Sequence, residues 1–152
     1  MKTKVGIVGL GIMGGAFARN LLAKGFPVVG YDVDATKLDA LRQAGVEAAS
    51  SPKDVALKAD RLITSLPSPK ALMAAVAGPG GIAEAKRDIV VADTCTLALA
   101  DKEAARAALE TAGTTLLDCP VSGTGAQAAK GDLVIFASGP EARAKSMQDV
   151  FE

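Results

Sequence analysis

Three glycines near the start of the chain, Gly9, Gly11 and Gly14, have the spacing of a loop that binds a nucleotide diphosphate. The first can turn the chain sharply, the second leaves room for a pyrophosphate, and the third lets a helix pack closely on a strand. A helix that starts near Ile12 would point free N–H groups and the positive end of its dipole at the phosphates. The pattern predicts pyrophosphate binding by the segment Gly9-Leu10-Gly11-Ile12-Met13-Gly14.

An acidic residue follows these glycines at an informative distance. Asp32 lies 18 residues after Gly14, close to the spacing of about 20 residues for an acid that binds ribose hydroxyls. Its carboxylate would repel a 2′-phosphate, and residues 33–36 contain no Arg or Lys to bind one. We therefore predict NAD as the cofactor, with NADP less favoured. The alternative is a glycine turn followed by a solvated Asp.

Two further polar segments follow apolar runs later in the chain. Asp93-Thr94-Cys95-Thr96 comes after the run at 89–92, and Ser122-Gly123 follows the run at 115–119. Hydroxyl groups at the ends of parallel strands can reach the second half of a dinucleotide or its substrate. The N–H groups beside Ser122 could hold a carboxylate. Taken alone, each segment is more often an ordinary turn.

The elements that would position these residues alternate between strand and helix. Strands are predicted at 4–8, 28–31, 46–48, 61–66, 89–92 and 115–119, with helices between them. Ser51-Pro52 and Ser68-Pro69 are typical helix starts, and Gly25 and Gly45 are typical helix ends. This alternation predicts an α/β fold of the Rossmann type, with a doubly wound, mostly parallel sheet in the order 3-2-1-4-5-6.

The segment after residue 119 departs from this rhythm. About a dozen residues separate the sixth strand from the apolar run at 133–137, which is short for a parallel crossover, so we expect an antiparallel seventh strand. A final helix after Gly139-Pro140 would place Met147, Val150 and Phe151 on one exposed apolar face. Such a face suggests continuation into another segment. We therefore expect residues 1–152 to be one domain of a longer protein.

The composition bears on partners and location. The chain has 17 basic and 17 acidic residues and a net charge of zero, so nothing indicates binding to nucleic acid or an anionic membrane. We find no signal peptide and no apolar stretch that could span a bilayer, and we expect a cytoplasmic protein. With no histidine and only Cys95 and Cys119, we expect no metal site and two buried, reduced cysteines.

Six ordered segments resemble the amino-terminal domain of the β-hydroxyacid dehydrogenases, the family of 3-hydroxyisobutyrate dehydrogenase, with 6-phosphogluconate dehydrogenase as a larger relative. The resemblance covers residues 4–139. It rests on Gly9-Leu10-Gly11-Ile12-Met13-Gly14, Asn20-Leu21-Leu22-Ala23-Lys24-Gly25-Phe26, Gly30-Tyr31-Asp32, Thr64-Ser65-Leu66-Pro67, Asp93-Thr94-Cys95-Thr96 and Asp118-Cys119-Pro120-Val121-Ser122-Gly123.

The resemblance implies an NAD-dependent oxidoreductase that transfers a hydride between the cofactor and a small 3-hydroxy acid. In addition to the glycine loop and Asp32, it implies that Leu66 and Pro67 line the cofactor groove and that Thr96 lies beside the nicotinamide ribose. Ser122 and Gly123 would orient the substrate. The chain departs from the family pattern at Cys95, where Ser is usual, and at Thr124, where a second Gly is usual.

The resemblance also implies a missing part. The proton-handling lysine of this family belongs to a helical domain that follows the cofactor domain and also forms the homodimer or tetramer. We therefore expect this chain alone to bind NAD and to turn over no substrate, and we interpret Lys130 as a solvated surface lysine. Two alternatives stay open: a free-standing nucleotide-sensing module, and an imine or keto reductase of the same superfamily. A sensor would have no use for the segments around Thr96 and Ser122.

Overall fold

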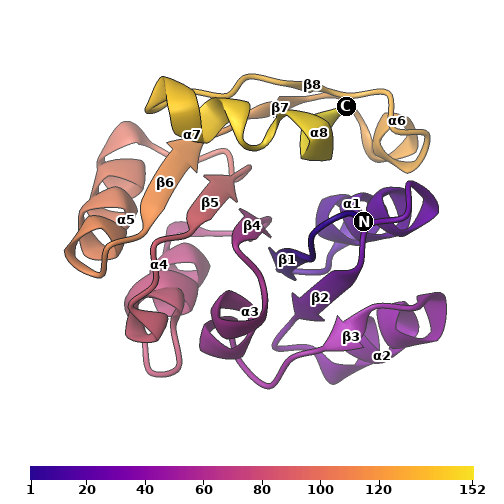
Figure 1. Cartoon of the computed structure of the whole chain (residues 1–152), viewed down its shortest axis with the longest axis horizontal. Helices are drawn as coiled ribbons and strands as arrows, with labels where there is room; N and C mark the ends of the chain where they lie inside the picture. The colour runs from indigo at the N-terminus through magenta and orange to yellow at the C-terminus, as the bar shows by residue number, and fades with distance from the viewer.

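A six-stranded parallel sheet forms the centre of the computed structural model, which describes all 152 residues (Figure 1). The strand order is β3-β2-β1-β4-β5-β6, as predicted. The strands are β1 (Val5–Val8), β2 (Val28–Tyr31), β3 (Glu47–Ala48), β4 (Arg61–Thr64), β5 (Val90–Asp93) and β6 (Thr115–Asp118). The order reverses between β1 and β4, which is the point where open sheets of this kind bind their ligands.

Helices cover both faces of the sheet, so the fold has three layers (Figure 1). Successive residues of a strand point to opposite faces, and Ile7 and Val8 accordingly lie in two different hydrophobic clusters. The helices on the first face include α1 (Ile12–Ala23) and α2 (Ala35–Ala44). The second face is covered by α3 (Pro52–Lys58), α4 (Pro69–Ala77), the 3₁₀-helix η1 (Ile82–Ala85) and α5 (Leu99–Thr111).

The predicted helix starts are confirmed by their hydrogen bonds. At the start of α3 the Ser51 Oγ accepts the Asp54 N–H at 3.0 Å, and at the start of α4 the Ser68 Oγ accepts the Ala71 N–H at 3.1 Å. In both helices a proline occupies the first turn, where its missing N–H has no partner to lose. A predicted helix end is also confirmed. At the carboxyl end of α2, Gly45 adopts φ +111°, the left-handed conformation that ends many helices.

The chain after β6 confirms one prediction and adds elements that the sequence did not indicate. As predicted, a strand in this region is antiparallel: β8 (Val134–Ile135) pairs with β7 (Val121–Ser122). The two form a separate small sheet, with the short helix α6 (Gly125–Ala129) between them. An antiparallel bridge between Asp118 and Ser138 connects this unit to the end of β6.

The prediction for the last fifteen or so residues was wrong in two respects. Two short helices, α7 (Glu141–Lys145) and α8 (Gln148–Phe151), replace the single helix. The apolar side chains are also not exposed, since Met147 is 0% and Val150 is 7% accessible. Both pack into the cluster on the α1 face, because the chain doubles back over the sheet after β8 (Figure 1). The expected apolar face is therefore covered by this same domain.

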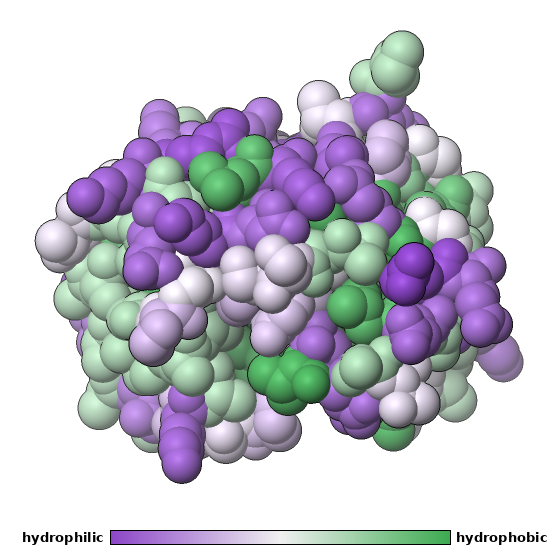
Figure 2. Space-filling view, turned by 90° about the horizontal axis from the view of Figure 1, so that it is seen from below, coloured by the Kyte–Doolittle hydropathy of each residue, from purple (hydrophilic) through white to green (hydrophobic).

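The surface is mixed in character. Seen from below, hydrophobic residues form small groups separated by hydrophilic ones (Figure 2), which is typical of a surface that faces water. Nowhere does a helix combine the length and the apolar character needed to cross a bilayer.

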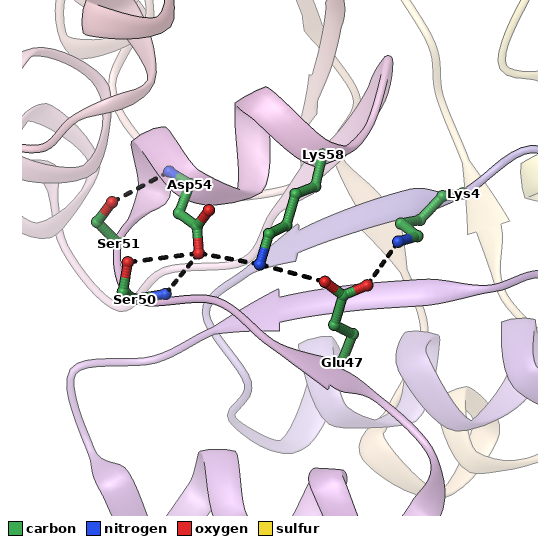
Figure 3. Close-up of polar contacts among 6 residues, drawn as sticks. All are labelled: Lys4, Glu47, Ser50, Ser51, Asp54 and Lys58. Atoms are coloured by element: carbon green, nitrogen blue, oxygen red, sulfur yellow. Dashed lines mark hydrogen bonds and ion pairs between the residues drawn. The ribbon is translucent and has the colours of Figure 1, made fainter.

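A cluster of charged residues joins β3 and α3 with Lys4, the residue before β1 (Figure 3). The Glu47 carboxylate of β3 lies 2.5 Å from the Lys4 Nζ and 3.1 Å from the Lys58 Nζ of α3. Lys58 also lies 3.2 Å from Asp54, whose carboxylate accepts the Ser50 N–H at 2.9 Å. The hydrogen bond from Lys4, and then that from Lys58, lowers the pKa of Glu47. The Ser50 N–H, and then Lys58, lowers the pKa of Asp54.

These two pKa shifts predict that part of the stability depends on pH. Both carboxyl groups have lower pKa values in the folded chain than their ordinary values of 4.5 and 3.8. Their contribution is therefore present above those values and is lost as pH falls through the folded-state pKa values. Since Glu47 is 43% exposed, we expect Glu47→Gln to cost about 0.5 kcal/mol near pH 7 and less near pH 3, where the carboxylate is closer to protonation. Urea unfolding at both pH values measures this difference.

The matched control is Asp132→Asn, which also converts an exposed carboxylate to an amide but breaks no ion pair. It should leave the free energy of unfolding unchanged at both pH values. An equal cost of Glu47→Gln at both pH values would contradict the assignment of the effect to the ion pairs.

Candidate functional site

The ends of five strands form one row along the carboxyl edge of the sheet. Tyr31 of β2 pairs in register with Val8 of β1, Val8 with Thr64 of β4, Thr64 with Asp93 of β5, and Asp93 with Asp118 of β6. The loops that follow these residues therefore open at the same edge. Every predicted site residue lies in one of these loops or in the first turn of the helix after it, except for Ser122 and Gly123, which belong to the β7 unit.

The three glycines of the first loop differ in what surrounds them. A Cβ atom at Gly9 would collide with the carbonyl oxygen of Ser65, and one at Gly14 would collide with the carbonyl oxygen of Gly9. Gly9 also adopts φ +95°. At Gly11, by contrast, a Cβ would meet no atom within 4 Å, and φ is −70°. The fold therefore requires glycine at Gly9 and Gly14, whereas at Gly11 the space is open.

This open space lies at the start of α1. Gly11 is the N-cap of the helix, no side chain caps it, and the first turn contains no acidic residue. The first N–H groups of a helix have no partners within it, and they carry the positive end of the helix dipole. A pyrophosphate fits such a place, because its oxygens can accept these N–H groups while a glycine lets it approach the backbone.

Asp32 also makes hydrogen bonds within the fold, which the sequence pattern did not indicate. Its Oδ2 accepts the Leu10 N–H at 2.7 Å, and its Oδ1 accepts the Asp34 N–H at 2.8 Å. The carboxylate thus braces the glycine loop against the end of β2. Each carboxylate oxygen keeps further acceptor capacity, and the residue is only half-buried. Asp32 can therefore hold the glycine loop and bind ribose hydroxyls at the same time.

Two hydrogen bonds connect the loop after β5 to the end of β4 and the loop that follows it. The Thr94 hydroxyl donates to the Thr64 carbonyl at 2.8 Å, and the Leu66 N–H donates to the Cys95 Sγ at 3.2 Å. The Thr94 hydroxyl is thus engaged inside the fold, whereas Thr96 is exposed at the same edge. Leu66 is half-buried and Pro67 exposed, so both side chains are at least partly accessible at this edge.

Both cysteines are buried, as predicted, and both are poor nucleophiles. Cys95 is 4% and Cys119 0% accessible. Burial, and then the nearby Asp93 charge, raises the pKa of Cys95 to about 12. Burial, and then the Asp118 charge, raises the pKa of Cys119 to about 12 as well. Since only the thiolate reacts readily, these thiols fill space and, at Cys95, accept a hydrogen bond.

Sequence reasoning missed a buried charged residue, Lys102 of α5. Its Nζ lies 2.5 Å from the Asp93 Oδ2 and 2.9 Å from the Asp118 Oδ1. Desolvation lowers the pKa of Lys102, but the hydrogen bonds and charges of Asp118 and Asp93 outweigh it, so the pKa is raised. Two acids at adjacent strand ends were a signal for such a partner. On its helix, however, Lys102 looks like any surface lysine.

The segment with Ser122 and Gly123 leads from β6 into α6. Gly123 has φ +147°, and a Cβ there would collide with Leu133, so this glycine has a structural reason beside its predicted role. Ser122 and Gly123 are exposed. Thr124, the departure from the family pattern, caps α6: its hydroxyl accepts the Gln127 N–H at 3.2 Å.

Helix α6 then rests directly on α1. Gly125 leaves room for the Ile12 side chain, and the Asn20 Nδ2 donates to the Ala128 carbonyl at 2.7 Å. These contacts hold the predicted substrate segment beside the glycine loop. Lys130, at the end of α6, is exposed as we expected.

The residues along this edge fit NAD. The amide groups at Gly11, Ile12 and Met13 would hold the pyrophosphate, Asp32 the adenosine ribose, and Leu66, Pro67 and Thr96 the nicotinamide side. When bound, NAD supplies the hydride-accepting C4 atom of the nicotinamide ring. The residues of this chain would bind and orient the cofactor.

Known proteins resemble the chain over almost its whole length. It is 36% identical to mouse 3-hydroxyisobutyrate dehydrogenase, mitochondrial, over 152 residues, which cover 99% of this chain and 45% of that protein. Among solved structures, Mycobacterium tuberculosis 3-hydroxyisobutyrate dehydrogenase superposes with a TM-score of 0.92 at 28% identity, over 99% of this chain and 51% of that one. Streptomyces aurantiacus imine reductase superposes with a TM-score of 0.88 at 26% identity, over 97% of this chain and 51% of that one.

The chain thus spans about half the length of these relatives. Residues 4–152 also match the family described as the NAD binding domain of 6-phosphogluconate dehydrogenase. The fold, the glycine loop and this match over nearly the whole chain agree, and the chain belongs to the family of NAD-binding domains of 6-phosphogluconate dehydrogenase.

Proposed function

We propose that this chain is the cofactor-binding half of an NAD-dependent dehydrogenase that acts on a small 3-hydroxy acid. The observation that supports the proposal is the row of strand ends, from which the glycine loop, the loop with Thr96 and the segment that leads to Ser122 all start. A nucleotide-sensing module needs only the glycine loop and Asp32. The likeness to 3-hydroxyisobutyrate dehydrogenases supports the enzyme.

In this proposal the residues of the chain orient the reactants. The glycine loop and Asp32 hold the adenosine half of NAD, and the Thr94 and Cys95 contacts keep the nicotinamide side in place. The Ser122 hydroxyl and the neighbouring N–H groups bind the carboxylate or hydroxyl of the substrate. Correct placement of two reactants can supply a large part of a rate enhancement.

The proton of the substrate hydroxyl needs a base that this chain does not provide. Lys130 is an exposed residue at the end of α6, whereas a catalytic lysine usually lies in a buried setting. The buried Lys102 is held between two carboxylates. We propose that a further, helical domain of the complete protein carries the proton-handling lysine, closes the site and forms a homodimer or tetramer.

The test compares the 152-residue chain with the complete protein. We expect the chain alone to bind NAD in a calorimetric titration and to form no NADH with 3-hydroxyisobutyrate, because the base is missing. The complete protein should form NADH from NAD and 3-hydroxyisobutyrate. The absorbance of NADH measures this reaction. Robust turnover by the isolated chain, or no turnover of any small 3-hydroxy acid by the complete protein, would contradict the proposal.

Reduction of an imine is the second candidate function. It is favoured by the superposition on Streptomyces aurantiacus imine reductase, which shows that the same scaffold occurs in that enzyme. A cyclic imine added with NADH in the same assay distinguishes the two functions. Turnover of the imine without turnover of hydroxy acids would favour the reductase.

A further inference from the structure

One buried ammonium group connects the ends of two neighbouring strands. Lys102 lies near the start of α5, and its side chain is only 6% exposed. Its Nζ lies 2.5 Å from the carboxylate of Asp93, the last residue of β5, and 2.9 Å from that of Asp118, the last residue of β6. The Asp93 carboxylate is 0% exposed, while that of Asp118 is 42% exposed. Lys102 therefore ties a fully buried acid to one at the open edge.

The connection extends to a third strand. The Asp93 Oδ1 accepts a hydrogen bond from the hydroxyl of Thr64, the last residue of β4, at 2.6 Å. The Lys102 Nζ also lies 3.4 Å from the Asp93 carbonyl oxygen. One side chain thus holds the ends of β4, β5 and β6 in a fixed relation. The loops that leave these ends lead to Leu66, Thr96 and Ser122.

Stability alone does not account for this network. Burying an ammonium and a carboxylate removes both from water, and a well-packed apolar replacement is often as stable as a buried ion pair. What the two ion pairs and the hydrogen bond from Thr64 to Asp93 add is position, because each links groups at neighbouring strand ends at a short distance. This geometry matters most where the loops above the network must present groups to a ligand.

We propose that Lys102 is a positioning residue for the nicotinamide half of the cofactor. It acts through Asp93, Asp118 and Thr64 and touches no ligand itself. The adenosine half depends on the glycine loop and Asp32, which are braced by a separate set of hydrogen bonds. The inference rests on the proposed function, because it requires NAD to lie along this edge.

The two halves of the cofactor can be separated by two probes. ADP contains the adenosine and both phosphates but lacks the nicotinamide ribose and the nicotinamide ring. We expect Lys102→Gln to weaken NAD binding about tenfold and to leave ADP binding within about twofold of wild type, in calorimetric titrations. A purely structural role would lower the folded fraction and weaken both probes equally, so the ratio of the two Kd values is the informative quantity.

The controls isolate the charge and its position. Lys102→Arg keeps a cation between the two acids and should restore most of the NAD affinity, and Lys130→Gln makes the same change on an exposed lysine and should have no effect. If Lys102→Gln does not fold, the double variant Asp93→Asn with Lys102→Gln replaces it. This variant removes both buried charges, so that neither is left unpaired, and it should show the same change in the ratio of the two Kd values.

The outcomes separate the inference from the function on which it rests. Wild-type chain that binds neither probe would overturn the proposed function. Wild-type chain that binds NAD, combined with an unchanged ratio of NAD to ADP affinity in the folded Lys102 variant, would overturn the role of Lys102 and leave the proposed function standing. Faster amide hydrogen exchange at Thr94 and Cys95 in the variant, without cofactor, is expected as an independent sign of the loosened loop.

Discussion

Gly11→Val should weaken NAD binding about 100-fold, or about 2.7 kcal/mol, while changing the melting temperature by less than about 3 °C. The backbone at Gly11 has φ −70° and ψ −157°, which a valine can adopt, and a Cβ there meets no protein atom within 4 Å. The side chain would instead occupy the space of the pyrophosphate and separate it from the N–H groups of α1. Calorimetric titration with NAD and thermal unfolding measure the two effects.

Gly14→Ala is the matched comparison, because it should give the opposite pattern. A Cβ at Gly14 would collide with the backbone of Gly9, so this variant should lose about 2 kcal/mol or more of unfolding free energy. Wild-type affinity in Gly11→Val would mean that no phosphate lies over this glycine. Loss of folding in Gly11→Val would mean that the space above it is not open.

Asp32→Asn should reduce the preference for NAD over NADP about 100-fold, again by calorimetric titration. The wild-type carboxylate accepts hydrogen bonds from the ribose hydroxyls and repels a 2′-phosphate. Asparagine has one acceptor oxygen and no charge, so it can still receive the Leu10 N–H while NAD binding weakens and NADP binding improves.

Asp34→Asn provides the control for charge alone. Asp34 is exposed two residues away, and its carboxylate caps α2 by accepting the Thr36 N–H at 2.9 Å. Asparagine is an equally good N-cap, so the fold should be unaffected. If both variants changed the cofactor preference equally, the effect would come from the general electrostatic field and not from a carboxylate at the ribose.

The sheet and the cofactor side of the site could be predicted from the sequence because their signals are local. Alternating apolar runs and helix caps such as Ser51 and Ser68 identify the elements, and the order of a doubly wound sheet follows from their alternation. The different tasks of Gly9, Gly11 and Gly14 also follow from their spacing, and the collisions at Gly9 and Gly14 together with the open space at Gly11 agree with them.

The rest depends on contacts between distant parts of the chain. Met147 and Val150 looked like an exposed stripe, because their pattern shows that they share a face but not what covers it. Lys102 is buried only because two strand ends meet beside it. The pairing of β7 with β8 consists of two residue pairs. Strands this short leave no periodic pattern in the sequence.

The central claim is that a dinucleotide lies along the carboxyl edge of the sheet, with its diphosphate on the amide groups at the start of α1. A crystal structure of the 152-residue chain soaked with NAD tests it most directly. We predict phosphate oxygens within hydrogen-bond distance of the N–H groups at Gly11, Ile12 and Met13, and the adenosine ribose on Asp32. Crystals that bind NAD elsewhere, or that leave this edge empty at saturating NAD, would contradict the account.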